Sequence, residues 1–156
     1  MTMKMQLGRL LIRFFQTWGI NGEFDRRRVV LEFDSAPHPR PSPLRNQVAV
    51  YLFFKDDVWL KVGMATYPAR FTSQHYGTGR SSSSIAKDIW RCREEFEYYG
   101  EEAEIDTWLC ENLGRVNIRV PEEYGDRFVK YLEAFLHFHL QPRFEGRRPR
   151  IENAHD

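Results

Sequence analysis

The sequence predicts a small mixed α/β domain, and three observations support this prediction. The chain has 156 residues, of which 42% are apolar and 15% aromatic, which suits one domain with one hydrophobic core. Two short apolar runs flank a polar turn at residues 55–57, a pattern typical of a β-hairpin. Before and after this hairpin, several segments space their apolar residues as amphipathic helices do.

Residues 1–46 are expected to form an N-terminal extension. Residues 5–18 have the apolar spacing of a helix, which Gly19 and Gly22 are expected to end. Residues 28–33 (RVVLEF) predict a strand by their β-branched content. The proline-rich residues 35–43 cannot continue a central strand, so they are expected to link this extension to the rest of the chain.

Residues 47–146 are expected to form the main domain, with the hairpin, a later strand and helices packed around the sheet. Its predicted strands are 48–54, 58–62 and 115–120, the last alternating like a half-buried strand. Its predicted helices are 68–75, 85–98, 105–113 and 121–140. Pro142 ends the last helix, and residues 147–156 are expected to form a basic tail.

The charges exclude a strongly basic protein but leave local clusters. The formal net charge is +1, so no global field attracts a polyanion. Arginines gather at residues 26–28 and 143–150, with an acidic stretch at 94–106 between them. These clusters are either solvated faces or two basic edges that meet phosphates while the acidic stretch faces away.

Membrane and zinc classes are not favoured. The longest fully apolar run, residues 48–54, is too short to span a bilayer, so we expect no membrane partner and a cytoplasmic location. The only cysteines, Cys92 and Cys110, form no CxxC pair. Two free thiols in a reducing cytoplasm are a simpler interpretation than a disulfide.

Four polar residues occur in an order that bears on function. Tyr51 and Lys61 stand on the two hairpin strands, where strand alternation allows both to project from one sheet face. Arg70 follows on the next predicted helix, and Glu133 lies on the long late helix before Pro142.

In this order and context the chain resembles the GIY-YIG nuclease superfamily over residues 48–146. Residues 49–51 (AVY) are similar to the GIY strand and residues 61–63 (KVG) to the YIG strand, with lysine in place of tyrosine. The segment 81–89 (SSSSIAKDI) is similar to one found in small bacterial members. The asparagine that often follows the late proline is missing, since Phe144 and Glu145 stand near that place.

The resemblance implies a DNA endonuclease that hydrolyses phosphodiester bonds with one Mg²⁺ or Mn²⁺ ion. Glu133 would hold the ion, because a single carboxylate suits an ion that keeps most of its waters. Arg70 would brace the phosphate through forked hydrogen bonds. Tyr51 would act as general base if nearby cations favoured its phenolate, or Lys61 would take the proton or hold the water.

Secondary candidates surround these residues. His75 is either a proton shuttle or a surface histidine, and His137, one helical turn after Glu133, is interpreted as structural rather than as a metal ligand. Residues expected to position the DNA backbone are Arg80, Ser82, Lys87, Arg143 and Arg147.

Two other functions fit the same sequence. Lys61 and the missing asparagine also suit a nucleic-acid-binding module whose cleavage is lost or weakened. The near-neutral charge and the acidic stretch suit an unrelated α/β interaction protein. For an active nuclease, a homodimer is possible, because one compact catalytic domain often needs a second copy to cut both strands.

Overall fold

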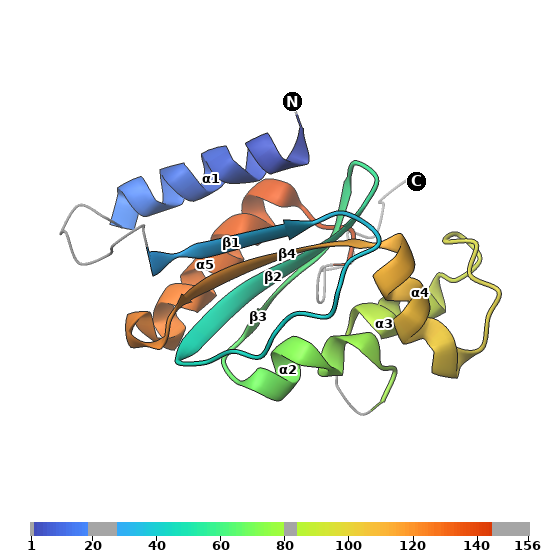
Figure 1. Ribbon diagram of the computed structural model, residues 1–156. Coiled ribbons are helices and arrows are strands. Elements are labelled where there is room, and N and C mark those ends of the chain that lie inside the picture. Colours follow the sequence, from blue (N-terminus) through green and yellow to red (C-terminus); the bar gives the residue numbers. More distant parts are fainter. Residues whose placement is uncertain (1, 19–27, 80–83, 145–156) are drawn as a thin grey trace, which may run out of the picture.

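The computed structural model describes residues 2–18, 28–79 and 84–144. In these ranges a four-stranded antiparallel sheet has the strand order β1-β4-β2-β3 (Figure 1). The strands are β1 (Val30–Asp34), β2 (Gln47–Lys55), β3 (Val58–Ala65) and β4 (Gly114–Pro121). The α-helices are α1 (Met3–Trp18), α2 (Pro68–Thr72), α3 (Ile85–Arg91), α4 (Ile105–Asn112) and α5 (Gly125–Leu140). The predicted class, a hairpin plus a later strand surrounded by helices, is confirmed.

The sheet is covered on both faces (Figure 1). On the first face, α1 and α5 pack on the even-numbered residues of β2 and β4, including Val50, Leu52, Val116 and Ile118. On the second face, α2, α3 and α4 pack on odd-numbered residues of β2, including Tyr51 and Phe53. Because both faces of β2 are buried, its sequence is almost continuously apolar. No helix in the described ranges is long and apolar enough to cross a membrane.

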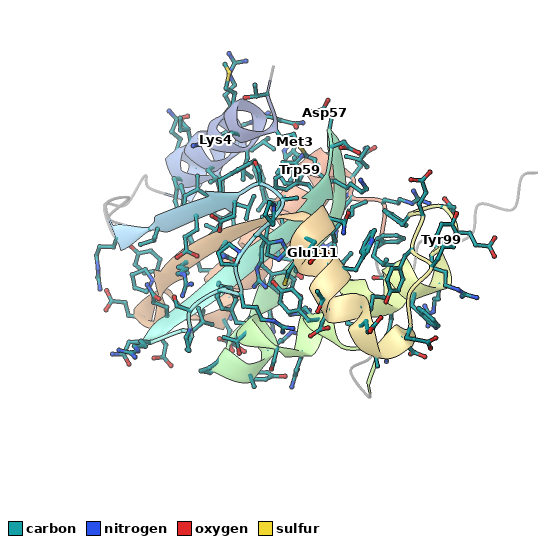
Figure 2. The ribbon with its side chains drawn as sticks, turned by 45° about the vertical axis from the view of Figure 1, so that its right-hand side comes forward. Met3, Lys4, Asp57, Trp59, Tyr99 and Glu111 are labelled. Carbon is teal, nitrogen blue, oxygen red and sulfur yellow. The ribbon has the colours of Figure 1, made fainter. Side chains whose placement is uncertain are left out.

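The hairpin has the geometry that the sequence predicts. Tyr51 pairs with Gly63 and Phe53 pairs with Lys61, so Tyr51 and Lys61 lie on the same face. The register shifts between Phe53 and Phe54. Figure 2 labels Asp57 at the hairpin tip and Trp59 near the start of α1.

The N-terminal residues are built into the same core. β1 pairs with β4 over its whole length, and α1 contributes Leu7, Leu11 and Phe14 to the first face. The segment between β1 and β2, predicted as a linker, buries His38 and Leu44 against the second face. β1 therefore belongs to the same sheet as the hairpin, and α1 and the segment between β1 and β2 pack against that sheet.

Three predicted helices have the wrong bounds. The late helix begins at Gly125, because Pro121 is still paired with Gln47 in the sheet and a 3-10 turn, η5 (Glu122–Tyr124), separates strand from helix. The helix predicted at 85–98 ends at Arg91, and Glu97 has a positive φ of 54°, which a helix does not tolerate. The helix predicted at 68–75 is divided into α2 and the 3-10 turn η3 (Gln74–Tyr76).

Candidate active site

The ring of Tyr51 lies directly across Gly63. A Cβ atom at Gly63 would stand 2.2 Å from the Tyr51 hydroxyl oxygen, so glycine is needed there for the ring to cross the neighbouring strand. Tyr51 is 1% exposed, and its hydroxyl oxygen lies 3.2 Å from Nδ1 of His75 in η3.

The outer edge of β3 is the place where the predicted residues meet. Arg70 donates its Nε–H to the carbonyl of Met64 at 3.0 Å, and its positive charge near Tyr51 acts to lower the pKa of that phenol. Glu133 reaches the same edge from α5, where the backbone N–H of Met64 favours the ionised form of its carboxyl group and so acts to lower its pKa. Tyr51, Arg70 and Glu133, from β2, α2 and α5, therefore converge at one end of β3.

Burial governs the proton affinity of Tyr51. Removal of the phenol from water raises its pKa above the ordinary value, and the nearby Glu133 adds to this effect. The positive charges of Arg70 and Arg115 act in the opposite direction but are outweighed. The expectation that neighbouring cations favour the phenolate is therefore not met by these side chains.

His75 is a buried neutral histidine. It is 1% exposed, which contradicts the interpretation of a surface residue. Burial, followed by the charges of Arg115, Arg70 and Lys61, lowers its pKa to about 3. In the neutral tautomer that carries its hydrogen on Nε2, Nδ1 of His75 accepts from the Tyr51 hydroxyl. Nε2 has no hydrogen-bond partner within the described part of the chain.

Lys61 is engaged by a residue that the sequence did not single out. Its ammonium forms an ion pair with the carboxylate of Asp88 on α3. The two side chains are 8% and 20% exposed, so the pair is largely shielded from water. An ammonium held in this way is not poised to accept a proton.

Glu133 fits the single-carboxylate site that the sequence predicts. Its side chain is partly buried, and burial raises its pKa, while His137, Arg70 and the Met64 N–H act in the opposite direction. His137 lies 3.1 Å from the Val62 carbonyl through Nε2. Because a carbonyl can only accept, Nε2 is the donor there and is not a metal ligand.

Other acidic or histidine ligands do not crowd this place. Within residues 2–18, 28–79 and 84–144, no group of three or more His, Cys, Asp or Glu side chains could hold a metal ion. A divalent ion at Glu133 would therefore depend on water and substrate oxygens for its other ligands, as Mg²⁺ commonly does.

Only some of the residues predicted to contact DNA lie within the described part of the chain. Arg80, Ser82 and Arg147 lie outside the described residues. Lys87 lies on α3 beside Asp88 and is partly buried. Arg143 forms an ion pair with Glu95, and its backbone N–H donates to Trp59, at the opposite end of β3 from Met64. Arg143 is thus separated along the strand from the convergence of Tyr51, Arg70 and Glu133.

Sequence reasoning missed the polar residues of β4. Arg115, Asn117 and Arg119 alternate with apolar residues, a pattern that predicted a half-buried strand. All of β4 is buried, so this prediction was wrong. The signal was present in the sequence as two arginines on one face of a strand, but only the covering segments identify that face as interior.

Comparisons with known proteins assign no family to the chain. No protein-family model, curated protein or solved structure matches it significantly.

Proposed function

We propose that this protein is a DNA endonuclease that depends on Mg²⁺ or Mn²⁺ and hydrolyses phosphodiester bonds at a single-metal site. The observation that carries the proposal is the convergence of Tyr51, Arg70 and Glu133. These residues are far apart in the sequence, yet they meet at one end of β3 around the backbone of Met64.

In this proposal each side chain has a distinct task. The bond from Arg70 Nε to the Met64 carbonyl fixes the guanidinium plane, so that its outer nitrogens can engage a phosphate. Glu133 supplies the hard oxygen that a divalent cation prefers. The bound ion would supply positive charge to the attacked phosphate.

Tyr51 and His75 provide a route for the proton of the attacking water. The Tyr51 hydroxyl accepts that proton while its own proton moves to His75 Nδ1, 3.2 Å away. This exchange needs no resting phenolate, which suits the raised pKa of Tyr51. The proton on His75 is disfavoured by burial, so it would have to leave when the leaving oxygen is protonated.

A second candidate, a nucleic-acid-binding module with lost or weakened cleavage, is favoured by the state of the two predicted bases. Tyr51 is held as a neutral phenol, and Lys61 is paired with Asp88. Such a module would keep Arg70 as a phosphate contact while making no product.

The test is a cleavage assay on supercoiled plasmid and on single-stranded DNA, with Mg²⁺, with Mn²⁺ and with EDTA. Glu133→Gln keeps the shape of the side chain but removes its charge, and Glu122→Gln, an exposed glutamate of η5, is the matched control. We expect metal-dependent products from the wild type and the control, and a loss of about a thousandfold in Glu133→Gln.

The other outcomes separate the candidates. DNA binding without products in any buffer supports the binding module. Products that persist in Glu133→Gln contradict the role of Glu133. A failure to bind DNA even at low salt, where phosphate contacts are strongest, overturns both candidates and favours an interaction protein.

A further inference from the structure

The guanidinium of Arg115 is enclosed by aromatic rings. Arg115 is 1% exposed, and its Cζ lies 4.9 Å from the ring centre of Phe71, 5.2 Å from that of Phe53, 5.5 Å from that of Tyr76 and 5.7 Å from that of Tyr51. Within the described residues, no carboxylate forms an ion pair with it.

A cation in such surroundings is unfavourable for folding by itself. Loss of hydration penalises a buried charge that lacks a direct counter-ion, and burial accordingly lowers the pKa of Arg115. Ring faces offset part of this penalty through cation–π attraction. An apolar side chain would fill the same space without this desolvation penalty. The presence of an arginine here therefore indicates a role beyond packing.

The hydrogen bonds of Arg115 indicate that role. Nη2 donates to the backbone carbonyl of Phe71 at 2.9 Å, and Nη1 donates to the Tyr76 hydroxyl at 2.7 Å. Phe71 directly follows Arg70, and Tyr76 directly follows His75. One planar group on β4 therefore holds both ends of the segment that carries two predicted site residues.

Further bonds fix the guanidinium itself. Nε donates to the side-chain oxygen of Asn117 at 2.8 Å, and Asn117 donates to Glu32 of β1 at 2.9 Å. The Tyr76 hydroxyl, which accepts from Arg115, lies 2.9 Å from Nε2 of His38, whose Nδ1 lies 2.6 Å from the Leu113 carbonyl. Since the carbonyl can only accept, His38 donates a hydrogen bond through Nδ1 and accepts one from the Tyr76 hydroxyl through Nε2.

We infer that Arg115 is a positioning residue for the proposed reaction: its guanidinium holds residues 70–76 against the ring of Tyr51 and thereby sets where Arg70 and His75 stand relative to Tyr51. This inference rests on the proposed function. It assigns to a buried residue of β4 the geometry of a site at the edge of β3, on the same side of the sheet as α2 (Figure 1).

Arg119 offers a matched control on the same strand and face. It is 4% exposed, and its guanidinium also lies near the Phe71 ring, at 4.8 Å. Its polar contacts include neither the Phe71 carbonyl nor the Tyr76 hydroxyl: they are Ser42 at 3.0 Å, the Pro43 carbonyl at 3.4 Å and, at 3.1 Å, Glu32, which also accepts from Asn117. A general effect of altering a buried arginine would appear at both positions.

The experiment compares full-length wild type, Arg115→Lys and Arg119→Lys. Lysine keeps the charge but cannot bridge Phe71, Tyr76 and Asn117 at once. Metal-dependent plasmid cleavage gives kcat and KM, and hydrogen–deuterium exchange with mass spectrometry follows residues 68–76. We expect Arg115→Lys to lower kcat by about 100-fold with KM changed by less than about threefold, and to speed exchange in 68–76 by at least about tenfold. Arg119→Lys should stay within about threefold on both readouts.

Equal effects in the two variants, or wild-type behaviour of Arg115→Lys, would overturn the inference. If Arg115→Lys does not fold, Tyr76→Phe removes only the hydroxyl that Nη1 meets, and kcat should fall by about tenfold with faster exchange at 68–76; unchanged kcat and exchange then reject the inference.

If the wild type cuts no DNA, the proposed function fails separately. The hydrogen–deuterium exchange data then test Arg115 without activity. Faster exchange at 68–76 in Arg115→Lys, but not in Arg119→Lys, supports Arg115 as the residue that holds this segment. Equal exchange in the two variants rejects that role.

Discussion

The two faces of the sheet solve the problem of burial in different ways. On the face covered by α1 and α5, the packed residues are almost all aliphatic or aromatic. On the face covered by α2, α3 and α4, aromatic rings are mixed with buried Lys61, His75, Arg115, Asn117 and Arg119. The same strands supply both faces, because their residues alternate between them.

The difference indicates that buried polar groups, which cost folding stability, are confined to the face that adjoins the proposed site. An apolar face gains from every contact and needs no particular geometry beyond good packing. A buried polar face is favourable only when its hydrogen bonds are satisfied, and it then fixes one arrangement of its groups. The proposed site adjoins the second face, and four predictions test this contrast.

The largest effect is expected from Arg70→Ala. Loss of a charged donor aimed at the phosphate should lower kcat/KM by about 100- to 1000-fold. Stability should fall by no more than about 1.5 kcal/mol, because the main bond lost in the folded state is that to Met64. Initial rates and urea unfolding measure the two effects. The control is Arg91→Ala, because Arg91 is an exposed arginine at the end of α3. An equal loss of rate in this control would mean that Arg70 acts only through its positive charge and makes no specific contact with the phosphate.

On the apolar face, Leu132→Ala should reverse this pattern. Leu132 is fully buried between α5 and the sheet, so its truncation should destabilise the fold by about 2–5 kcal/mol. Cleavage per folded molecule should change by less than about threefold, because Leu132 belongs to the core of the other face. Urea unfolding, and rates measured well below the transition, test both statements. A specific loss of rate would show that the two faces are coupled.

His75 should make stability depend on pH. Its folded pKa is about 3, against an ordinary value of 6.5, so between these values the unfolded chain binds the proton and the folded chain does not. The contribution is therefore present above pH 6.5 and is lost as the pH falls toward 3, by about 1.4 kcal/mol per pH unit. His38, whose pKa is also lowered by burial, adds to the same trend.

The measurement is urea unfolding at a series of pH values for wild type and His75→Gln. The variant should show a shallower loss of stability on acidification. His139→Gln, on α5, should keep the wild-type slope. Identical slopes in wild type and His75→Gln would mean that folding does not lower the pKa of His75.

The smallest effect is expected from Arg143→Gln. The pair with Glu95 is 40% and 60% exposed, so its loss should change stability by no more than about 1 kcal/mol. DNA affinity at low salt should change by less than about threefold, because Arg143 lies at the other end of β3 from Arg70. Fluorescence anisotropy at several salt concentrations is the assay. A salt slope reduced by about one would instead identify Arg143 as a phosphate contact.

Local patterns predicted the fold well. The hairpin at 47–65 follows from two strand-like runs around a short polar turn. The helix predicted to begin at 85 does begin there, and Ser84 caps it by accepting from the backbone N–H of Lys87 at 3.2 Å. Pro121 misled the prediction, because proline can begin a helix or end a strand, and pairing with Gln47 decides for the strand.

The surroundings of the site depended on contacts that no local pattern contains. Asp88 lies 27 positions from Lys61, and Arg115 lies 39 positions from Tyr76, so neither partner could be identified by spacing. The alternation of β4 was correctly identified, but the segment at 35–46 and the turn η3 make its polar face interior. Covering layers of this kind are set by the whole chain rather than by the strand.

The outer edge of β3 has one more consequence. Open strand edges are templates on which a second chain can add by hydrogen bonding, yet this edge is occupied along its length. The backbone N–H groups of Arg143 and Phe144 donate to the carbonyls of Trp59 and Leu60. His137 and Arg70 meet the carbonyls of Val62 and Met64, and the carboxylate of Glu133 faces the N–H of Met64. Arg70 and Glu133 thus also cover the open edge of the sheet and hinder pairing with a second chain. Variants that remove both side chains should form oligomers or fibrils more readily as the protein concentration rises.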